Sequence, residues 1–204
     1  MSEATIENGC ARVAGGEWLM GLSQPAAVRG AVQVKGLRGL FVPDRACVRA
    51  VTAAADCWCA VQERPFLTRF DALPDEPLAL VSGKLLVAPL AARKGARSVK
   101  LVPFSFSRST PVTEFQKGWA VSATRSRVAR VALEDGETLA VRPDAVVAWT
   151  GKDPSGFCPK LSLLDMLLPR GPQNLTYTFH GPSTVWFEGA ASARPRRRGA
   201  QRIW

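Results

Sequence analysis

The chain has 204 residues, 47% of them hydrophobic, which is enough to bury the core of one domain of generous size. Lys and Arg outnumber Asp and Glu by 27 to 17, and the net charge of +10 favours polyanionic partners, either nucleic acid or an acidic membrane surface. The 17 glycines and 15 prolines are spread along the chain, which is typical of a mostly β protein and argues against long helices.

The first 24 residues show little apolar periodicity, and glycines interrupt them repeatedly. We therefore predict that residues 1–24 form an extended lead-in to the domain. Glu3, Glu7 and Glu17 fall in this segment, whereas a secretory or mitochondrial leader would be basic and poor in acidic residues. No uncharged apolar run approaches the roughly 20 residues that a membrane-spanning helix needs, so we predict no transmembrane segment.

From Pro25 onward the sequence divides into short apolar segments separated by Gly, Pro or Asp. The segment AVRGAVQVKG alternates apolar and polar residues in its second half, which predicts a strand. Similar segments recur at intervals of about 8 to 12 residues as far as STVWFEG, a spacing that is typical of a β-sandwich or barrel. We predict a single β domain over residues 25–190.

The five cysteines follow no spacing that is typical of a disulfide framework or a zinc site, which indicates a reducing compartment. Cys57 and Cys59 flank Trp58, so on a strand both thiols would face the same side and could meet a soft metal or an oxidant. Neither a second cysteine pair nor a nearby histidine completes four ligands, so we interpret both as small core residues. We expect no metal site and no cofactor.

Basic residues gather in two places in the middle of the chain. Alternate positions of a strand would turn Arg125, Arg127 and Arg130 into a charged ridge. The second cluster is a candidate nucleic-acid contact and consists of Arg93, Lys94, Arg97 and Lys100.

An acidic turn, LEDGET, separates two apolar segments and raises the question of catalysis. A loop one residue longer than a two-residue turn would pair Leu133 with Leu139 and place the apolar residues of both strands on one face. The turn would then be a solvated hairpin tip or a corner between sheets. Paired-carboxylate catalysis needs two acids on opposite sides of a cleft, which neither arrangement offers, so we predict no catalytic residues here.

Near the end of the domain, LTYTFHGPSTVWFEG predicts a second hairpin whose apolar residues, Tyr177 and Phe179 among them, share one face. His180, the single histidine of the chain, then points away from that face. It could act as a general base, but no motif ties an acid or a nucleophile to it, so we expect an exposed or structural role.

Between Pro159 and Pro169 the sequence is apolar on most sides, and Ser162 could cap a helix. We predict a short leucine-rich helix over residues 161–168. It either plugs an open end of the β domain or docks on a partner protein, and the candidate docking residues are Leu163, Leu164, Leu167 and Leu168.

The segment 191–204 is basic and too polar to fold alone. Guanidinium groups suit phosphate oxygens, and neutralising each phosphate releases counterions, so such a segment would anchor RNA in a salt-sensitive way. A solubilising tail and a contact with an acidic protein face are the alternatives. Trp204 could stack on a base. The arginines of this candidate nucleic-acid contact are Arg194, Arg196, Arg197, Arg198 and Arg202.

The second half of the chain carries a leucine-glycine-glutamate turn, a Val-x-Pro segment leading into a Val-Val-Ala-Trp strand, and a late Gly-Pro turn before a Val-Trp strand. With these motifs, residues 118–189 resemble the altered-inheritance-of-mitochondria proteins and their bacterial relatives. Ser183 stands where the family has a second glycine. The matching positions are Leu133, Gly136, Glu137, Val141, Pro143, Val146, Val147, Ala148, Trp149, Gly181, Pro182, Val185 and Trp186.

The resemblance implies a β-sandwich or double-stranded barrel like that of the trp RNA-binding attenuation protein, here called TRAP-like. It also implies no known catalytic residues. For the eukaryotic members it implies a mitochondrial setting that is tied to inner-membrane organisation.

We therefore expect a mostly β protein, a TRAP-like β-sandwich or double-stranded barrel with one short leucine-rich helix and extended termini. No nucleophile elbow, phosphate loop, dinucleotide-binding or zinc-protease motif occurs, so we expect no enzyme. The expected function is a structural or assembly component of a mitochondrial ribonucleoprotein such as the ribosome, bound to RNA and to other protein subunits. The alternatives are an inner-membrane scaffold that binds membrane proteins or anionic lipid, and a small-ligand-binding or enzymatic β-barrel.

Overall fold

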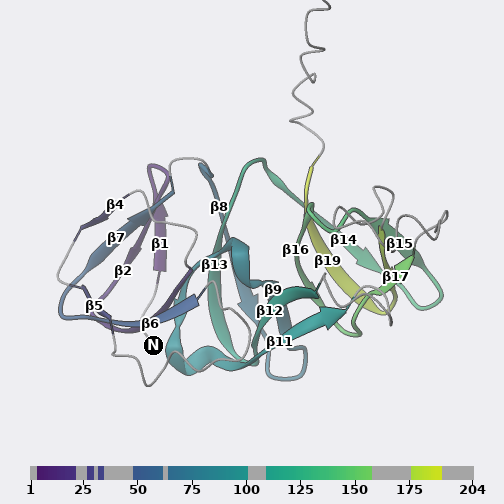
Figure 1. The fold of residues 1–204 in the computed structure, drawn as a ribbon, viewed down its shortest axis with the longest axis horizontal. Helices are drawn as coiled ribbons and strands as arrows, with labels where there is room; N and C mark the ends of the chain where they lie inside the picture. The colour runs from purple at the N-terminus through teal and green to yellow at the C-terminus, as the bar shows by residue number, and fades with distance from the viewer. Residues whose placement is uncertain are drawn as a thin grey trace, which may run out of the picture.

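The computed structural model describes residues 4–21, 27–29, 32–34, 48–61, 64–100, 109–157 and 176–189. These residues form four antiparallel sheets, two outer and two inner, which follow one another along the long axis of the molecule (Figure 1). Three apolar clusters, one between each pair of neighbouring sheets, hold the stack together. The prediction of a mostly β protein is therefore confirmed.

The N-terminal half contains one outer and one inner sheet. In sheet order, the N-terminal outer sheet consists of β1 (Ala4–Glu7), β2 (Cys10–Val13), β7 (Cys57–Ala60) and β4 (Ala27–Arg29). The N-terminal inner sheet consists of β5 (Val32–Val34), β6 (Val48–Ala53), β3 (Gly16–Gly21), β10 (Leu85–Pro89), β13 (Gly118–Thr124) and β8 (Phe66–Ala72).

The C-terminal half repeats this plan with an inner sheet of six strands and a smaller outer sheet. The C-terminal inner sheet consists of β11 (Arg93–Lys100), β12 (Ser109–Phe115), β9 (Leu78–Val81), β16 (Val146–Thr150), β19 (Ser183–Glu188) and β14 (Val128–Leu133). The C-terminal outer sheet consists of β15 (Thr138–Val141), β18 (Thr176–His180) and β17 (Ser155–Phe157). Two short 3-10 turns, η2 (Ser82–Lys84) and η3 (Leu90–Ala92), flank β10.

The central strands of the inner sheets are apolar on both faces because sheets cover them on both sides. All five residues of β16 are buried, and so are the first four residues of β10. Outer strands alternate instead: β7 shows buried and half-buried residues in turn. A continuous apolar pattern thus marks the central strands of the inner sheets, whereas edge strands of the inner sheets such as β14 also carry exposed residues.

The prediction of an extended lead-in over residues 1–24 is wrong. Residues 4–21 contain β1, β2 and β3, and β3 lies in the middle of the N-terminal inner sheet, where Trp18 and Leu19 are each 1% exposed. The ring of Trp18 lies 5.5 Å from that of Trp119 on β13. The apolar run of β3 shows no alternation because both of its faces are buried, and this is why periodicity missed it.

The strand pairings predicted for both hairpins are wrong, whereas the alternative prediction that the acidic turn is a corner between sheets is correct. β14 pairs with β19, with Leu133 opposite Ser183, and β15 pairs with β18, with Thr138 opposite His180. The two segments therefore bend together from the C-terminal inner sheet into the outer sheet, and the acidic turn is the corner between sheets. The bend brings the chain so close that a Cβ atom at Gly181 would lie 1.8 Å from the carbonyl oxygen of Glu134.

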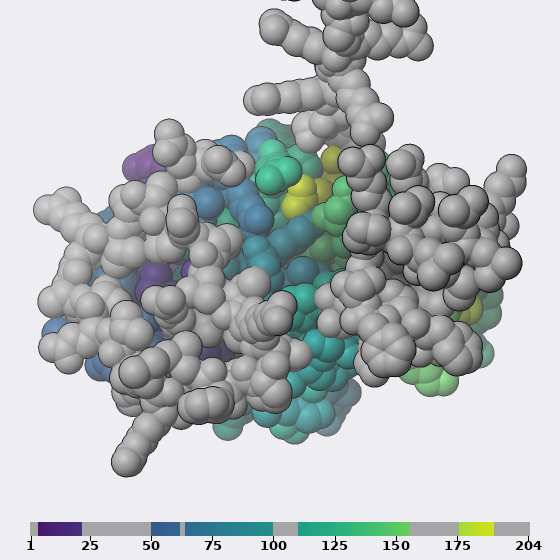
Figure 2. Space-filling view, in the orientation of Figure 1, coloured from purple at the N-terminus to yellow at the C-terminus, as the bar shows by residue number. Residues whose placement is uncertain are grey.

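The middle of the chain joins the two inner sheets. From this segment β8, β10 and β13 enter the N-terminal inner sheet, whereas β9, β11 and β12 enter the C-terminal one. Between the sheets, the ring of Phe70 on β8 meets that of Trp186 on β19 edge to face, with centroids 5.5 Å apart. In the space-filling view the chain colours accordingly run from purple and blue on one side to green and yellow on the other, with teal between them (Figure 2).

The predicted helix over residues 161–168, with its four candidate docking leucines, lies outside the described residues, as does segment 191–204. Among the residues that the structure describes, no helix has the length and hydropathy needed to cross a bilayer.

Candidate anion-binding site

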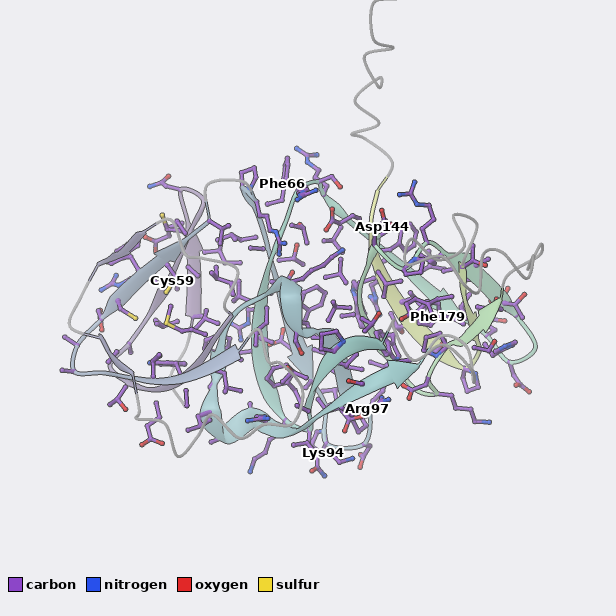
Figure 3. All side chains as sticks on the ribbon, in the orientation of Figure 1. Cys59, Phe66, Lys94, Arg97, Asp144 and Phe179 are labelled. Atoms are coloured by element: carbon purple, nitrogen blue, oxygen red, sulfur yellow. The ribbon has the colours of Figure 1, made fainter. Side chains whose placement is uncertain are left out.

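A cavity of about 640 Å³ opens where β19 ends, beside the turn that leads from β15 to β16. Asp144, in that turn, lies next to the end of β19 (Figure 3). The volume is in the range of small-molecule and cofactor sites. The charged groups of the lining are four bases and two acids, an excess of two positive charges, and they are Arg64, Lys84, Arg125, Arg142, Asp144 and Glu188.

Lys84 is the most buried of these cations, and it holds the cavity walls together. Its Nζ atom donates to Glu188 Oε1 at 2.8 Å and to the carbonyl oxygen of Asp144 at 2.7 Å. The two paired side chains are only 12% and 17% exposed. Burial lowers the pKa of Lys84, and the carboxylate of Glu188 opposes this shift. Lys84 thus ties η2 to β19 and to the turn at Asp144.

Arg142 and Asp144 form an ion pair on the outer rim of the cavity. Arg142 Nε donates to Asp144 Oδ1 at 3.1 Å, and a second contact joins the NH2 group to the other carboxylate oxygen. The Arg142 guanidinium lowers the pKa of Asp144, chiefly through this hydrogen bond. Both side chains are exposed, so the pair holds the rim weakly and its positive charge is largely neutralised.

Three guanidinium groups at or beside the cavity have no such partner. Arg125 and Arg127 are exposed, and no carboxylate among the described residues pairs with either of them. Arg64 is half-buried, and its NH1 group donates to the carbonyl oxygen of Gly83, which anchors the guanidinium without neutralising it. Arg64 and Arg125 account for the excess of two positive charges in the cavity, and Arg127 adds a third beside it; we call these three the unpaired arginines.

The backbone beside the unpaired arginines is fixed to the end of β19. Ser126 is buried, and its hydroxyl donates to the carbonyl oxygen of Gly189 at 3.1 Å. The amide of Gly189 donates back to the carbonyl oxygen of Arg127 at 3.0 Å. The turn between β13 and β14 therefore holds Arg125 and Arg127 at the point from which the arginine-rich sequence 191–204 follows.

The predicted ridge does not form on one strand, because Arg125 and Arg127 lie in the turn between β13 and β14 and only Arg130 lies on β14. Arg130 lies over the ring of Trp186, 5.9 Å from its centroid. On β11, Arg97 Nε contacts Glu114 at 2.5 Å and Arg97 NH2 contacts Asp153 at 2.6 Å. The carboxylate of Asp153 makes the largest contribution to raising the pKa of Arg97.

The other members of the β11 cluster are less engaged. Lys94 is exposed, whereas Arg93 is half-buried with its Nε atom enclosed and without a hydrogen-bond partner. The side chain of Lys100 lies outside the described residues. The five candidate arginines of segment 191–204 also lie outside them, so nucleic-acid contact by these residues stays a prediction.

The acidic corner is built by hydrogen bonds. Glu137 Oε2 accepts from the amide of Glu134 at 2.8 Å, and the carbonyl oxygen of Glu137 accepts from the amide of Gly181 at 3.0 Å. Gly136, which turns the chain, has a φ of +83°, a value that favours glycine. The Glu137 carboxylate therefore stabilises the turn by accepting a backbone hydrogen bond.

His180 is exposed, as predicted, but it has a neighbour that the sequence did not indicate. Ser155 Oγ lies 3.4 Å from His180 Nε2. This separation is longer than the reach of a general base to its proton donor. The arrangement is a surface contact between β17 and β18.

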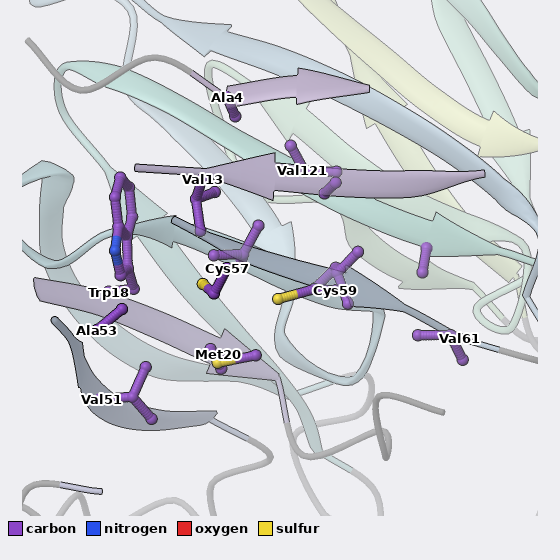
Figure 4. Packing of buried hydrophobic residues seen from close by; sticks show 14 of the residues in the cluster. Ala4, Val13, Trp18, Met20, Val51, Ala53, Cys57, Cys59, Val61 and Val121 are labelled. Atoms are coloured by element: carbon purple, nitrogen blue, oxygen red, sulfur yellow. The ribbon is translucent and has the colours of Figure 1, made fainter. Parts of the chain in front are cut away.

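Cys57 and Cys59 project from one face of β7 into the core between the N-terminal sheets, toward Met20 (Figure 4). They are 1% and 0% exposed. A hydrogen bond between the two thiols lowers the pKa of Cys57 and, together with burial, raises that of Cys59. Their placement in the core is as predicted. Among the described residues, no group of three or more candidate metal-ligating side chains occurs.

The cavity itself was not predictable from the sequence. Its cations come from positions 64, 84, 125 and 142, which no motif links. The ridge prediction named Arg125 and Arg127 but not their neighbours. Arg64 lies shortly before β8 and belongs to neither of the basic clusters in the middle of the chain, so nothing in the sequence marked it.

Comparisons with known proteins establish the fold. No protein-family model matches the chain, and no curated protein does. The crystal structure of protein SPYM3_0169 from Streptococcus pyogenes is similar, with a TM-score of 0.69 and 13% sequence identity, over 93% of this chain and 94% of that chain. A likeness at this identity shows a common fold and leaves function to the site.

Proposed function

We propose that the protein is a non-enzymatic, RNA-binding structural or assembly component of a larger ribonucleoprotein. The observation that carries the proposal is the group of unpaired arginines, Arg64, Arg125 and Arg127, at a cavity with an excess of positive charge. Guanidinium groups present forked donors that match phosphate oxygens. The net charge of +10 adds a long-range attraction to any polyanion.

The arginine-rich sequence 191–204 extends this surface. It follows Gly189, which is hydrogen-bonded to the backbone of Arg127, so its attachment point lies beside the unpaired arginines. A second set of cations tethered to the first raises their effective concentration on one polyanion. RNA, with one phosphate per nucleotide, would engage both sets together.

The resemblance to the altered-inheritance-of-mitochondria proteins supports a mitochondrial setting for this role. A mitochondrial ribonucleoprotein such as the ribosome supplies folded RNA and neighbouring protein subunits to a compact basic domain. An anionic membrane surface would instead attract cations regardless of their geometry. Binding to anionic phospholipid vesicles is therefore the result that competes with RNA binding.

Fluorescence anisotropy of a labelled single-stranded RNA tests the proposal, with salt varied between about 50 and about 200 mM. The double variant Arg125→Gln/Arg127→Gln is expected to bind more weakly and to reduce the salt slope by about 1.4, that is about 0.7 for each phosphate that the variant no longer neutralises. The matched control, Lys117→Gln/Lys152→Gln, removes the same charge from exposed positions elsewhere and is expected to change the slope less.

Two results would overturn the proposal. In the first, the site variant and the control bind RNA with the same slope, so net charge alone acts. In the second, the wild-type protein binds vesicles of anionic phospholipid and fails to bind RNA at the same salt concentration, which would indicate the membrane instead.

A further inference from the structure

The lining of the cavity offers apolar contacts as well as positive charge, and a phosphate alone requires only the charge. The apolar lining residues include Phe187, Leu139 and Ala145, which also pack against the core between the C-terminal sheets. The cationic lining residues include Arg64 and Arg125. A ligand that uses both kinds of residue carries an apolar group and a negative charge on the same small framework.

Among the cavity cations, Arg64 is more available to a ligand than Lys84. The ammonium group of Lys84 is already bound by the carboxylate of Glu188 and by the carbonyl oxygen of Asp144. Arg64 uses one of its five donors on Gly83, which orients the guanidinium, and no other side-chain hydrogen bond joins it to the described residues. An anchored guanidinium loses less conformational entropy when it binds an anion.

The aromatic component comes from Phe187 on β19. Its backbone pairs with Ala129 on one side and Val146 on the other, so the residue is held in the middle of a sheet. Phe187 is half-buried, packs against the edge of the core between the C-terminal sheets, and is one of the residues that line the cavity. An aromatic ring on a rigid strand is the usual platform on which proteins stack unpaired bases.

We infer that the cavity receives one unstacked nucleotide of a single-stranded RNA segment, with its base against Phe187 and its phosphate on Arg64 and Arg125. The inference rests on the proposed function and adds a substrate class to it. A base inside an A-form duplex is paired and stacked and cannot enter such a cavity, so the site selects single strands. Arg127, outside the cavity, would contact the next phosphate along the strand.

The first experiment compares two RNAs of equal length, one single-stranded and one duplex, at the same salt concentration. The wild-type protein is expected to bind the single strand at least about 10-fold more tightly, because stacking of one base is available only there. The variant Phe187→Leu keeps an apolar side chain and is expected to lose most of this preference. Arg64→Gln, at a half-buried surface position, is expected to weaken single-strand binding.

The second experiment needs no variant, and so it does not depend on how substitutions affect folding. Uridine 5′-monophosphate, uridine, inorganic phosphate and dodecanoate are titrated separately into the full chain and followed by calorimetry. Uridine 5′-monophosphate is expected to bind more tightly than either uridine or phosphate alone, because it alone carries both a base and a phosphate.

The outcomes separate the inference from the proposed function. Equal binding of single-stranded and duplex RNA would overturn the inference and leave the RNA-binding function standing. Binding of neither RNA would overturn both. Tight binding of dodecanoate without binding of uridine 5′-monophosphate would assign the cavity to an acyl anion and overturn the inference.

Discussion

Lys84 and Glu188 form an ion pair of 2.8 Å in the lining of the cationic cavity, and at most 17% of either side chain is exposed. Removing one partner of such a pair leaves the other charge poorly solvated. Lys84→Met is therefore expected to destabilise the protein by about 3 kcal/mol, and Lys84→Met/Glu188→Met is expected to recover most of this loss. Urea unfolding of both single variants and the double variant measures the coupling; additive losses would contradict it.

A pair of glycines tests how closely β3 approaches β10. A Cβ atom at Gly21 would lie 1.7 Å from the carbonyl oxygen of Leu85, whereas one at Gly83 would meet nothing within 4 Å. Gly21→Ala is expected to destabilise the protein by more than about 3 kcal/mol, because backbone must move in a packed core. Gly83→Ala, the matched control, is expected to stay within about 1 kcal/mol of wild type. Thermal unfolding that ranks the two equally would contradict the packing described above.

The Arg142–Asp144 pair predicts a contribution to stability that depends on pH. The guanidinium lowers the pKa of Asp144 below its ordinary value of 3.8, so the contribution is present above that pH and is lost as the pH falls through the lower, folded-state value. Because both side chains are largely exposed, the effect is expected to be below about 1 kcal/mol. Denaturant unfolding between pH 2 and 5 is expected to show a shallower acid loss for Asp144→Asn than for wild type. A steeper loss in the variant would reverse the assigned sign.

Deletion of residues 191–204 tests the contribution of the arginine-rich segment. The truncated chain is expected to unfold at the wild-type temperature, because the removed sequence is rich in arginine and too polar to supply a hydrophobic core. Its affinity for single-stranded RNA is expected to depend less on salt, with the slope reduced by up to about 3.5 for five arginines at about 0.7 each. The matched comparison is a chain of full length in which these arginines are replaced by glutamine. An unchanged slope in both chains would show that the segment makes no phosphate contacts.

The corner of the C-terminal sheets shows what the alternation of apolar and polar residues can predict and what it cannot. The alternation around Leu133 and Leu139 correctly predicted two strands with a turn between them. It could not predict that each strand takes a distant partner, because pairing β14 with β19 brings together residues as far apart in the sequence as Val128 and Glu188. Local alternation is the same for either partner, so only the packing of whole sheets distinguishes them.

The mistake at the N-terminus has a related cause. Trp18, Leu19 and Met20 form a run without alternation, and the surrounding glycines made the segment resemble a loop. Burial on both faces of an inner sheet removes the polar half of the pattern by which strands are recognised. The same condition applies to β16, where flanking turns made the strand visible.

By itself, the sequence determined that the chain forms many short strands and carries a large positive charge. Strand formation follows from local alternation and turn residues, and charge follows from composition, so neither needs distant contacts. Only the tertiary structure decided which cations keep their charge available. Arg97 lies against Glu114 and Asp153, whereas Arg64, Arg125 and Arg127 have no carboxylate partner among the described residues. A carboxylate neutralises a guanidinium only when the two lie within a few ångströms of each other, and the fold sets those distances.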